Sequence, residues 1–259
     1  MEEYFKNKRV VVIGPANYLS LITKETKENI KNSDTIVRIN RGFDLVEQYS
    51  SIVGKKTDVL YNNLLGDCIN GGVLDPKKIA SAEVKHIRTV PKSDIKGIAI
   101  SNTTNIKNKE TYMSLLDLQK NHKINTSIID CNMFSNAARK VDCRPTTGFV
   151  ALLDILSYLP TNLHVTGYSF YLGGVLKGYF GGKSPGGIFK TFGRSEDEEI
   201  ERNFNSTRHV HANMWNYCKE SFLTLENISF DPILTNILEM DSFSKEKYQK
   251  IIVNYSKSK

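Results

Sequence analysis

Short apolar runs alternate with amphipathic stretches along this chain. The run 8–13 (KRVVVI) is rich in β-branched residues and stops at Gly14, which is typical of a buried parallel strand before a tight turn. Over 18–30, sparse apolar positions among Lys and Glu predict a helix with one face on a sheet. Further strands are expected at 35–39, 59–61, 86–90, 95–100, 126–129 and 162–166, and further helices at 110–119, 149–159, 196–204, 211–220 and 232–240.

This alternation predicts an α/β fold, with a Rossmann-like, mostly parallel sheet and helices on both of its faces. The 259 residues, 40% of them apolar, suit one domain covering 1–259. Eight glycines lie between Gly173 and Gly193, too many for a packed element. We therefore expect 172–194 to be a mobile lid loop within that domain.

The net charge of +7 and the pI near 9.1 suit an anionic ligand, a membrane surface or nucleic acid. Because the lysines are scattered and no nucleic-acid-binding motif is present, no nucleic acid partner is expected. Only the stretch 244–259 gathers five lysines beside apolar residues. This stretch fits either a solvated tail or a peripheral contact with an anionic membrane.

The start of the chain has no apolar stretch of secretory length, and no run of eighteen apolar residues occurs. The four cysteines, Cys68, Cys131, Cys143 and Cys218, lie far apart without a Cys-x-x-Cys pair. We therefore expect reduced thiols, no zinc site and a cytoplasmic location, with membrane contact limited to the periphery.

Small and polar residues collect where the predicted strands end or the helices begin. They are Gly14, Asn17, Asn40, Asn62, Thr147 and Gly167. Because parallel strands bring their carboxyl ends to one edge of a sheet, these distant positions are expected to converge on a single pocket.

Two parts of the chain carry longer motifs. The first part contains, in order, VVVIGPANYLS, IKNSDTIVRINRG and VGKKTDVLYNN, and the second reads RPTTGFVALLDILSYLPTNLHVTGYSFY. The two parts resemble the L and S sialylmotifs of the sialyltransferases, of the animal type and also of the compact bacterial type. The resemblance covers 8–64, 144–171 and a histidine near 211, and it implies a single-domain, GT-A-like variant of the fold. The middle of the chain shows no match.

The resemblance also implies roles for individual residues around a CMP-activated sugar. Gly14 and Asn17 would lie near the phosphate or ribose, and Asn40 and Asn62 would hydrogen-bond the nucleotide or the sugar. The other implied contacts are an anion at the helix start formed by Thr146, Thr147 and Gly148, a cation from Arg144, close approach at Gly167 and a ligand-facing Tyr171. For Arg144, a surface position before a proline is an equal alternative.

His211 is the candidate general base. It opens a predicted helix at the chain position where these families place their catalytic histidine, and an imidazole can take a proton from an acceptor hydroxyl. His209 would be the base if the register were shifted. The remaining histidines, His86, His122 and His164, are expected to be bystanders.

Three features depart from the animal-type pattern. The position five residues after His211 is Asn216 rather than glutamate, and the nearest glutamate is Glu220. The cysteine that each of the L and S motifs holds is missing here. The first turn reads Gly-Pro-Ala-Asn, which moves the expected asparagine to Asn17.

The function implied is an inverting, metal-independent glycosyltransferase that needs no cofactor. It would move sialic acid, or a related nonulosonic acid, from its CMP-activated donor to a hydroxyl of a glycan or glycolipid. The acidic run SEDEEIE opens a predicted helix, where carboxylates favour the positive end of the dipole and are usually structural.

Two other functions stay open: a CMP-Kdo-type transferase of the same fold and a non-catalytic nucleotide-binding module. An NAD-binding Rossmann protein is disfavoured because Gly-x-Gly-x-x-Gly is absent after the first strand. The oligomeric state is also open.

Overall fold

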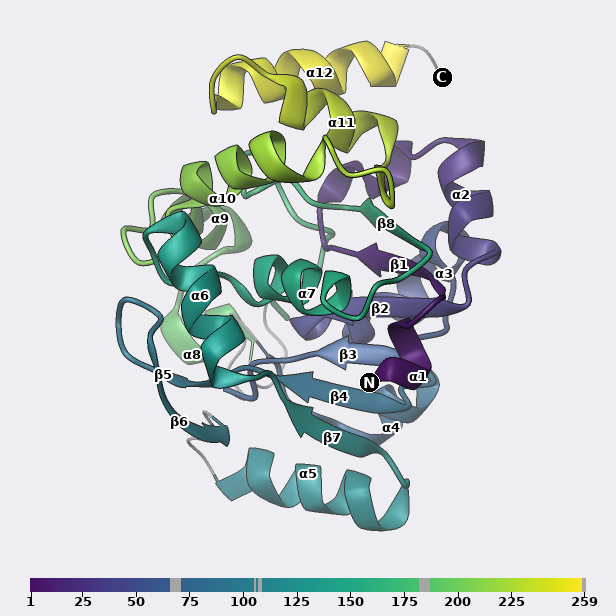
Figure 1. Ribbon diagram of the computed structural model, residues 1–259, viewed down its shortest axis with the longest axis vertical. Helices are drawn as coiled ribbons and strands as arrows, with labels where there is room; N and C mark the ends of the chain where they lie inside the picture. The colour runs from purple at the N-terminus through teal and green to yellow at the C-terminus, as the bar shows by residue number, and fades with distance from the viewer. Residues whose placement is uncertain (66–70, 105, 107–108, 182–186, 258–259) are drawn as a thin grey trace.

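The computed structural model describes residues 1–65, 71–104, 106, 109–181 and 187–257. Within them the chain forms a seven-stranded sheet in the order β7-β4-β3-β2-β1-β8-β9, and every pair of neighbouring strands is parallel (Figure 1). The strands are β1 (Arg9–Ile13), β2 (Thr35–Ile39), β3 (Val59–Tyr61), β4 (His86–Thr89), β7 (Asn125–Ile128), β8 (Asn162–Thr166) and β9 (Ile228–Phe230).

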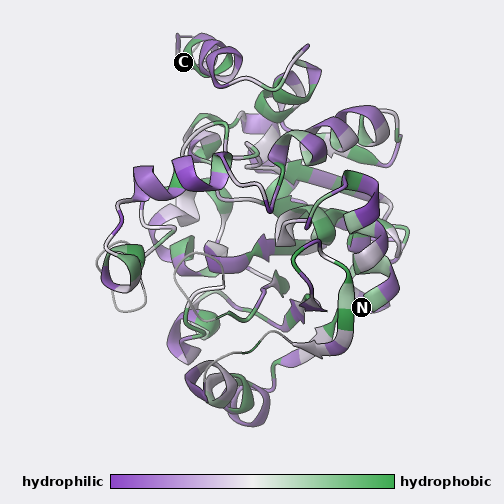
Figure 2. Ribbon diagram, turned by 90° about the vertical axis from the view of Figure 1, so that its left-hand side faces the viewer, coloured by the Kyte–Doolittle hydropathy of each residue, from purple (hydrophilic) through white to green (hydrophobic). Residues whose placement is uncertain are grey.

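Helices surround this sheet, so the expected α/β fold with a mostly parallel sheet is confirmed. Many of these helices carry both hydrophilic and hydrophobic residues, which is typical of helices that pack on a core with one face (Figure 2). The helical elements are α1 (Glu2–Phe5), η1 (Asn17–Leu21), α2 (Lys24–Lys31), η2 (Asn40–Leu45), α3 (Val46–Val53), α4 (Pro76–Ser81), α5 (Lys109–Asn121), α6 (Cys131–Val141), α7 (Thr147–Leu156), α8 (Ile188–Phe192), α9 (Glu196–Phe204), α10 (His211–Tyr217), η3 (Cys218–Phe222), α11 (Pro232–Glu239) and α12 (Lys245–Lys257).

The order of the strands reverses at β1. From β1 the chain builds the sheet in one direction through β2, β3, β4 and β7, and it then returns to add β8 on the other side of β1. Val11 of β1 is thus paired with Ile36 of β2 and with His164 of β8. In open α/β sheets, ligands bind beyond the carboxyl ends of the strands at such a reversal.

Helix α7 is fixed to the sheet by a buried ion pair. Asp154 of α7 accepts two hydrogen bonds from the Arg88 guanidinium of β4, both at 2.9 Å, and one from the Tyr61 hydroxyl of β3 at 2.6 Å. All three residues are buried. The contact sets the position of α7 relative to the strand ends, and hence that of its N-terminus.

One strand predicted from the sequence is displaced. Residues 95–100 were expected to form a strand, but Asp94 starts a turn there: its backbone N–H donates to the carbonyl of Ile98, and its carboxylate accepts from the Ile98 N–H. Gly97 in this turn has φ +91°. The strand therefore begins four residues later, as β6 (Ala99–Thr104), which pairs antiparallel with β5 (Pro91–Ser93) outside the main sheet.

The helix expected over 18–30 is two elements, η1 and α2. They are separate because the Thr23 side chain caps α2 by accepting from the Thr26 N–H. The helical elements α1, η2, α3, α4, α6, α8 and α12 and the strands β5 and β9 were not predicted.

The basic stretch 244–259 is folded over most of its length. It forms α12, which packs on α11, and Tyr248 is only 4% exposed. Several of its lysines contact acids, as Lys250 does with Glu246 at 2.7 Å. A membrane contact here stays a prediction, and no helix within the described residues is long and apolar enough to cross a bilayer.

The glycine-rich stretch 172–194 is described on both sides of 182–186, which lie outside the described residues. Before that gap Tyr179 and Phe180 are buried, and after it α8 begins at the buried Ile188. The Gly178 N–H donates to the Glu196 carboxylate at 3.1 Å. The described ends of this stretch are therefore packed, and the motion of a lid stays a prediction.

Candidate active site

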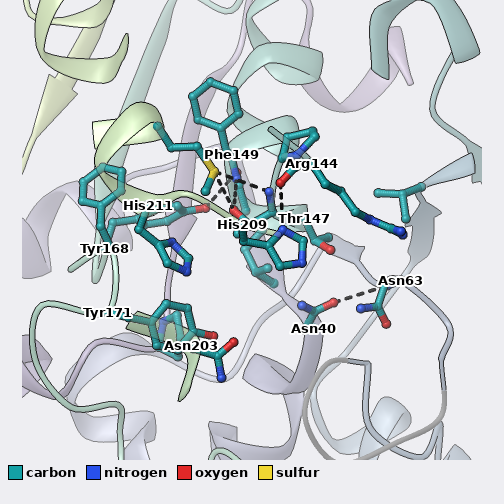
Figure 3. Close-up of a pocket in the computed structure, with 18 of the residues that line it drawn as sticks. Asn40, Asn63, Arg144, Thr147, Phe149, Tyr168, Tyr171, Asn203, His209 and His211 are labelled. Carbon is teal, nitrogen blue, oxygen red and sulfur yellow. Dashed lines mark hydrogen bonds between the residues drawn. The ribbon is translucent and has the colours of Figure 1, made fainter. Parts of the chain in front are cut away.

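A cavity of about 370 Å³ lies beyond the carboxyl ends of β1, β2 and β8 (Figure 3). Its wall comes from segments far apart in the sequence: the loop after β1, the start of η2, the hairpin strand β5, the first turn of α7, the loop after β8, the end of α9 and the start of α10. The expected convergence of strand ends on one pocket therefore occurs. The predicted residues that line it are Asn40, Arg144, Thr146, Thr147, Gly148, Gly167, Tyr171, His209 and His211.

The first turn of α7 presents its amides at this wall. Thr146 caps the helix by accepting from the Phe149 N–H at 3.2 Å, and Thr147 and Gly148 follow in the first turn. Space at Gly148 is tight, because a Cβ there would lie 3.2 Å from the Tyr168 hydroxyl oxygen, so that the ring would have to shift slightly. The Tyr168 hydroxyl donates to the Gly148 carbonyl at 3.3 Å. Free amides at a helix N-terminus favour an anionic ligand.

Gly14 and Gly167 lie against each other where β1 and β8 end. A Cβ on Gly14 would be 2.3 Å from the Gly167 carbonyl oxygen, and one on Gly167 would be 2.6 Å from the Gly14 carbonyl oxygen. Gly167 also has φ +74°. Both glycines thus allow the two loops to meet, but only Gly167 lines the cavity.

The asparagines of the sequence pattern divide between the site and its support. Asn40 lines the cavity, and its Oδ1 accepts from the Asn63 N–H at 3.2 Å. Asn62 is fully buried, and its side chain bonds to the backbone of Gly71 and Leu64 outside the cavity. Asn63 lines the cavity instead. Because successive side chains at a strand end point to opposite sides, only one of this pair can face the ligand.

Asn17 also lies outside the cavity lining. Its backbone N–H donates to the Gly174 carbonyl at 3.0 Å, and its Oδ1 accepts from the Tyr248 hydroxyl at 3.2 Å. The side chain therefore connects the loop after β1 with α12.

His211 opens α10 and is 4% exposed. A backbone carbonyl, that of Asn203, accepts a hydrogen bond from its ring, while Nε2 has no partner within the described part of the chain. This leaves Nδ1 as the donor and Nε2 with its lone pair available. Burial lowers the pKa of His211 to about 3, with His209 adding to the effect, so the ring is neutral at physiological pH.

His209 is the second imidazole at the cavity. Its Nδ1 donates to the Arg144 carbonyl at 2.8 Å, and burial lowers its pKa to about 4. The Arg144 N–H in turn donates to the Arg208 carbonyl at 3.2 Å. The loop before α7 and the loop before α10 are thus joined, and His209 and Arg144 are held as one unit.

The backbone after β8 is strained where it places Tyr171. Phe170 and Tyr171 have φ of 50° and 59°, in the left-handed region that bulky residues rarely adopt. Each such residue costs about 1–3 kcal/mol and persists only when its surroundings hold it. The Tyr171 ring lies 4.9 Å, centroid to centroid, from the His211 ring. Figure 3 draws both side chains in the wall of the cavity. Strain of this kind is concentrated at functional sites.

The charge of the cavity is positive. Lys92, Arg144 and Arg208 line it, and none of its described lining residues is an aspartate or glutamate. Burial, with a smaller effect of the neighbouring Arg208, lowers the pKa of Arg144 to about 10. Arg144 remains charged at neutral pH, so the cavity attracts an anion.

Several lining residues were missed in the sequence, among them Asn63, Lys92, Tyr168, Asn203 and Arg208. Arg208 directly precedes His209 and Tyr168 directly follows Gly167, so proximity to residues already chosen could have indicated both. Lys92 could not have been found, since it lies in the hairpin whose turn was misplaced. Among the described residues no cluster of three or more His, Cys, Asp or Glu side chains could hold a metal ion.

The chain is similar to known proteins in structure and not in sequence. No protein-family model matches the chain, and no curated protein matches its sequence. A solved structure that does match is described as the sialyltransferase CstII from Campylobacter jejuni in complex with a substrate analogue, CMP-3FNeuAc. The two chains are 13% identical, the match covers 86% of this chain and 81% of that chain, and the TM-score is 0.46. A similarity this distant does not establish a shared function, so function has to be inferred from the cavity itself.

Proposed function

We propose that the protein is an inverting glycosyltransferase that moves sialic acid, or a related nonulosonic acid, from a CMP-activated donor to a glycan or glycolipid hydroxyl. The observation that carries the proposal is the pairing, in one cavity, of a neutral His211 with a free Nε2 and a wall of cations and helix amides. A base and an anion site side by side are what this transfer requires.

The charge of such a donor matches the cavity. A CMP-linked nonulosonic acid carries one negative charge on its phosphodiester and one on its sugar carboxylate. The α7 amides, Arg144 and Arg208 can hold these two groups, while Asn40 and Asn63 offer neutral donors and acceptors for the nucleoside or sugar. A volume of about 370 Å³ lies within the range of small-molecule pockets.

The reaction follows as a direct displacement. The acceptor oxygen attacks the anomeric carbon while its proton passes to Nε2 of His211. The bond from the anomeric carbon to the phosphate oxygen breaks, and CMP leaves with that electron pair. The imidazolium that results lies near the newly dianionic phosphate, which stabilises it. Because attack and departure take place on opposite faces, the anomeric configuration inverts, and no metal is required in this scheme.

The decisive experiment offers CMP-sialic acid and CMP-Kdo, with a glycan acceptor array, and identifies products by mass spectrometry in buffer containing EDTA. We expect a sialylated product. Transfer from CMP-Kdo alone would assign the alternative donor, and CMP binding without transfer from either donor would assign a non-catalytic nucleotide-binding module. Activity lost in EDTA and restored by manganese would contradict the metal-independent scheme.

The role of His211 is tested by replacing it with alanine. Turnover is expected to fall roughly 100- to 10,000-fold, with CMP affinity changed little, because only the proton acceptor is lost. His209→Ala, measured in parallel, decides between the two imidazoles. His122→Ala, at the exposed end of α5, is the control. A near-normal rate for His211→Ala, with a large loss for His209→Ala, would transfer the role to His209.

A further inference from the structure

We propose that the C-terminal helix α12 is a working part of the active site and that its Tyr248 is a positioning residue. In this proposal Tyr248 holds the segment 171–176, and thereby keeps Tyr171 against His211. The effect on ligand binding rests on the proposed function, whereas the effect on the segment itself does not.

The first contact is between the Tyr248 ring and Gly173. A Cβ on Gly173 would lie 2.2 Å from Cε1 of Tyr248 and 2.4 Å from its hydroxyl oxygen. No other residue than glycine fits there without moving the ring. Gly173 is only two residues after Tyr171, so the ring packs directly on the backbone that leaves the cavity.

The second contact runs through Asn17. The Tyr248 hydroxyl donates to Asn17 Oδ1 at 3.2 Å, and the Asn17 backbone N–H donates to the Gly174 carbonyl at 3.0 Å. The Asn17 side chain also closes on Gly174, where a Cβ would lie 2.8 Å from Nδ2. Tyr248, Asn17 and the two glycines thus form one interlocked group.

Further contacts to the segment come from Pro15 and Ala16 of the loop after β1. The Leu176 N–H donates to the Pro15 carbonyl at 2.7 Å, and Val175 forms a β-bridge with Ala16. Pro15, Ala16 and Val175 all line the cavity. The segment is therefore held between this loop and α12, and any movement of it changes the cavity wall.

The strained backbone explains why a clamp is needed. Phe170 and Tyr171 occupy left-handed conformations immediately before the clamped glycines. Such conformations relax unless the chain on each side is fixed. On one side the chain is fixed by β8, and on the other by Gly173 and Gly174 with their contacts. Without Tyr248 the second anchor is weakened, and the Tyr171 ring is free to leave its place 4.9 Å from His211.

Helix α12 also offers a matched control. Tyr255 lies two turns further along and packs toward the core, and its hydroxyl accepts from the Asn236 side chain of α11 at 2.8 Å. Asn236 lies on α11, outside the segment 171–176. Tyr255→Ala therefore loosens the packing of α12 on α11 while Tyr248 keeps its contacts to Gly173 and Asn17.

The test compares Tyr248→Ala, Tyr248→Phe and Tyr255→Ala with the wild-type chain by amide hydrogen exchange and thermal melting. We expect the Asn17 and Leu176 amides to exchange about tenfold faster or more in Tyr248→Ala, because these two hydrogen bonds fix the segment. The amide of Val165 in β8 should be unchanged. In Tyr248→Phe, which keeps the ring, the exchange rates of these two amides should lie between those of the wild type and of Tyr248→Ala. Tyr255→Ala should lower the thermal midpoint without changing these two exchange rates. Where Tyr248→Ala fails to fold, Gly173→Ala replaces it, since the added Cβ displaces the same ring.

Calorimetric titration with CMP gives the second readout. CMP affinity is expected to fall about tenfold in Tyr248→Ala and to stay within about twofold of wild type in Tyr255→Ala, because preorganisation of the wall is lost only in the first. Equal exchange at Leu176 in the two alanine variants would overturn the proposal. A wild-type chain that does not bind CMP would contradict the proposed function, and the exchange result would still decide the role of Tyr248.

Discussion

The buried, neutral state of His211 predicts how stability responds to acid. The ring is 4% exposed, and burial lowers its pKa to about 3, against 6.5 for an unperturbed histidine. Between these two values the unfolded chain binds a proton at this position and the folded chain does not. The folded protein therefore keeps its full stability with respect to His211 above pH 6.5 and loses stability at this site as the pH falls from 6.5 toward 3.

The magnitude at pH 5 follows from the distance to the unfolded pKa. That distance is 1.5 pH units, at about 1.4 kcal/mol each, so protonation of this one site in the unfolded chain costs about 2 kcal/mol of folding free energy at pH 5. His211→Gln removes the titrating group. Urea unfolding at pH 7.5 and pH 5 should show that the variant loses about 2 kcal/mol less than the wild type over this interval.

The control is His122→Gln, at the end of α5 with 39% of its side chain exposed. The same substitution at this surface position shows the effect on stability that does not depend on a buried imidazole. If His211→Gln loses as much stability as the wild type between the two pH values, burial does not lower the pKa of His211, and the buried, uncharged state of the ring is refuted. This assay needs neither donor nor acceptor, so it tests the environment of the imidazole independently of the substrate.

Three further outcomes test other parts of the structure. Asp154→Ala should destabilise the protein by about 3–5 kcal/mol in urea unfolding, because it leaves the buried Arg88 without its carboxylate; a change below 1 kcal/mol would contradict the anchoring of α7. Gly14→Ala should lower the thermal midpoint and reduce soluble yield, since its Cβ meets the Gly167 carbonyl, which is backbone and cannot rotate away. Arg144→Gln should weaken CMP binding about tenfold and reduce its dependence on salt, as measured by calorimetry in 50 and 300 mM NaCl; an unchanged affinity would place Arg144 outside the anion site.

The central sheet was predictable because its signals are local. The strands β1 and β2 are rich in β-branched residues. They and β8 are buried over all or nearly all of their length, and each is followed by a glycine or an asparagine, so the apolar pattern and the turn residues indicate the same boundaries. The hairpin β5–β6 was not, because its position depends on the Asp94 carboxylate capping its own turn, and the apolar Ile95 there is 72% exposed. An apolar residue in an exposed turn therefore led to the prediction of a strand at 95–100.

The site was predictable in its location more than in its individual contacts. The residues at the predicted strand ends indicated the correct edge of the sheet. His209, His211 and the start of α7 line the cavity at this edge. Asn17 and Asn62 have the residue type expected of ligand contacts, but their side chains bond to backbone and to Tyr248. Nothing in the local sequence distinguishes an asparagine that supports a loop from one that faces a ligand, since both uses require the same amide.

The reversal of strand order at β1 has a consequence for biosynthesis. β1 is made early but pairs with β8, whose residues lie about 150 positions later, so that Val11 meets His164. A chain emerging from the ribosome can assemble β1 to β4 while the anion site has only one of its walls. The loop after β8, the histidine pair and α12 are made later, in that order. The nascent chain therefore has no complete cavity until these segments have been added.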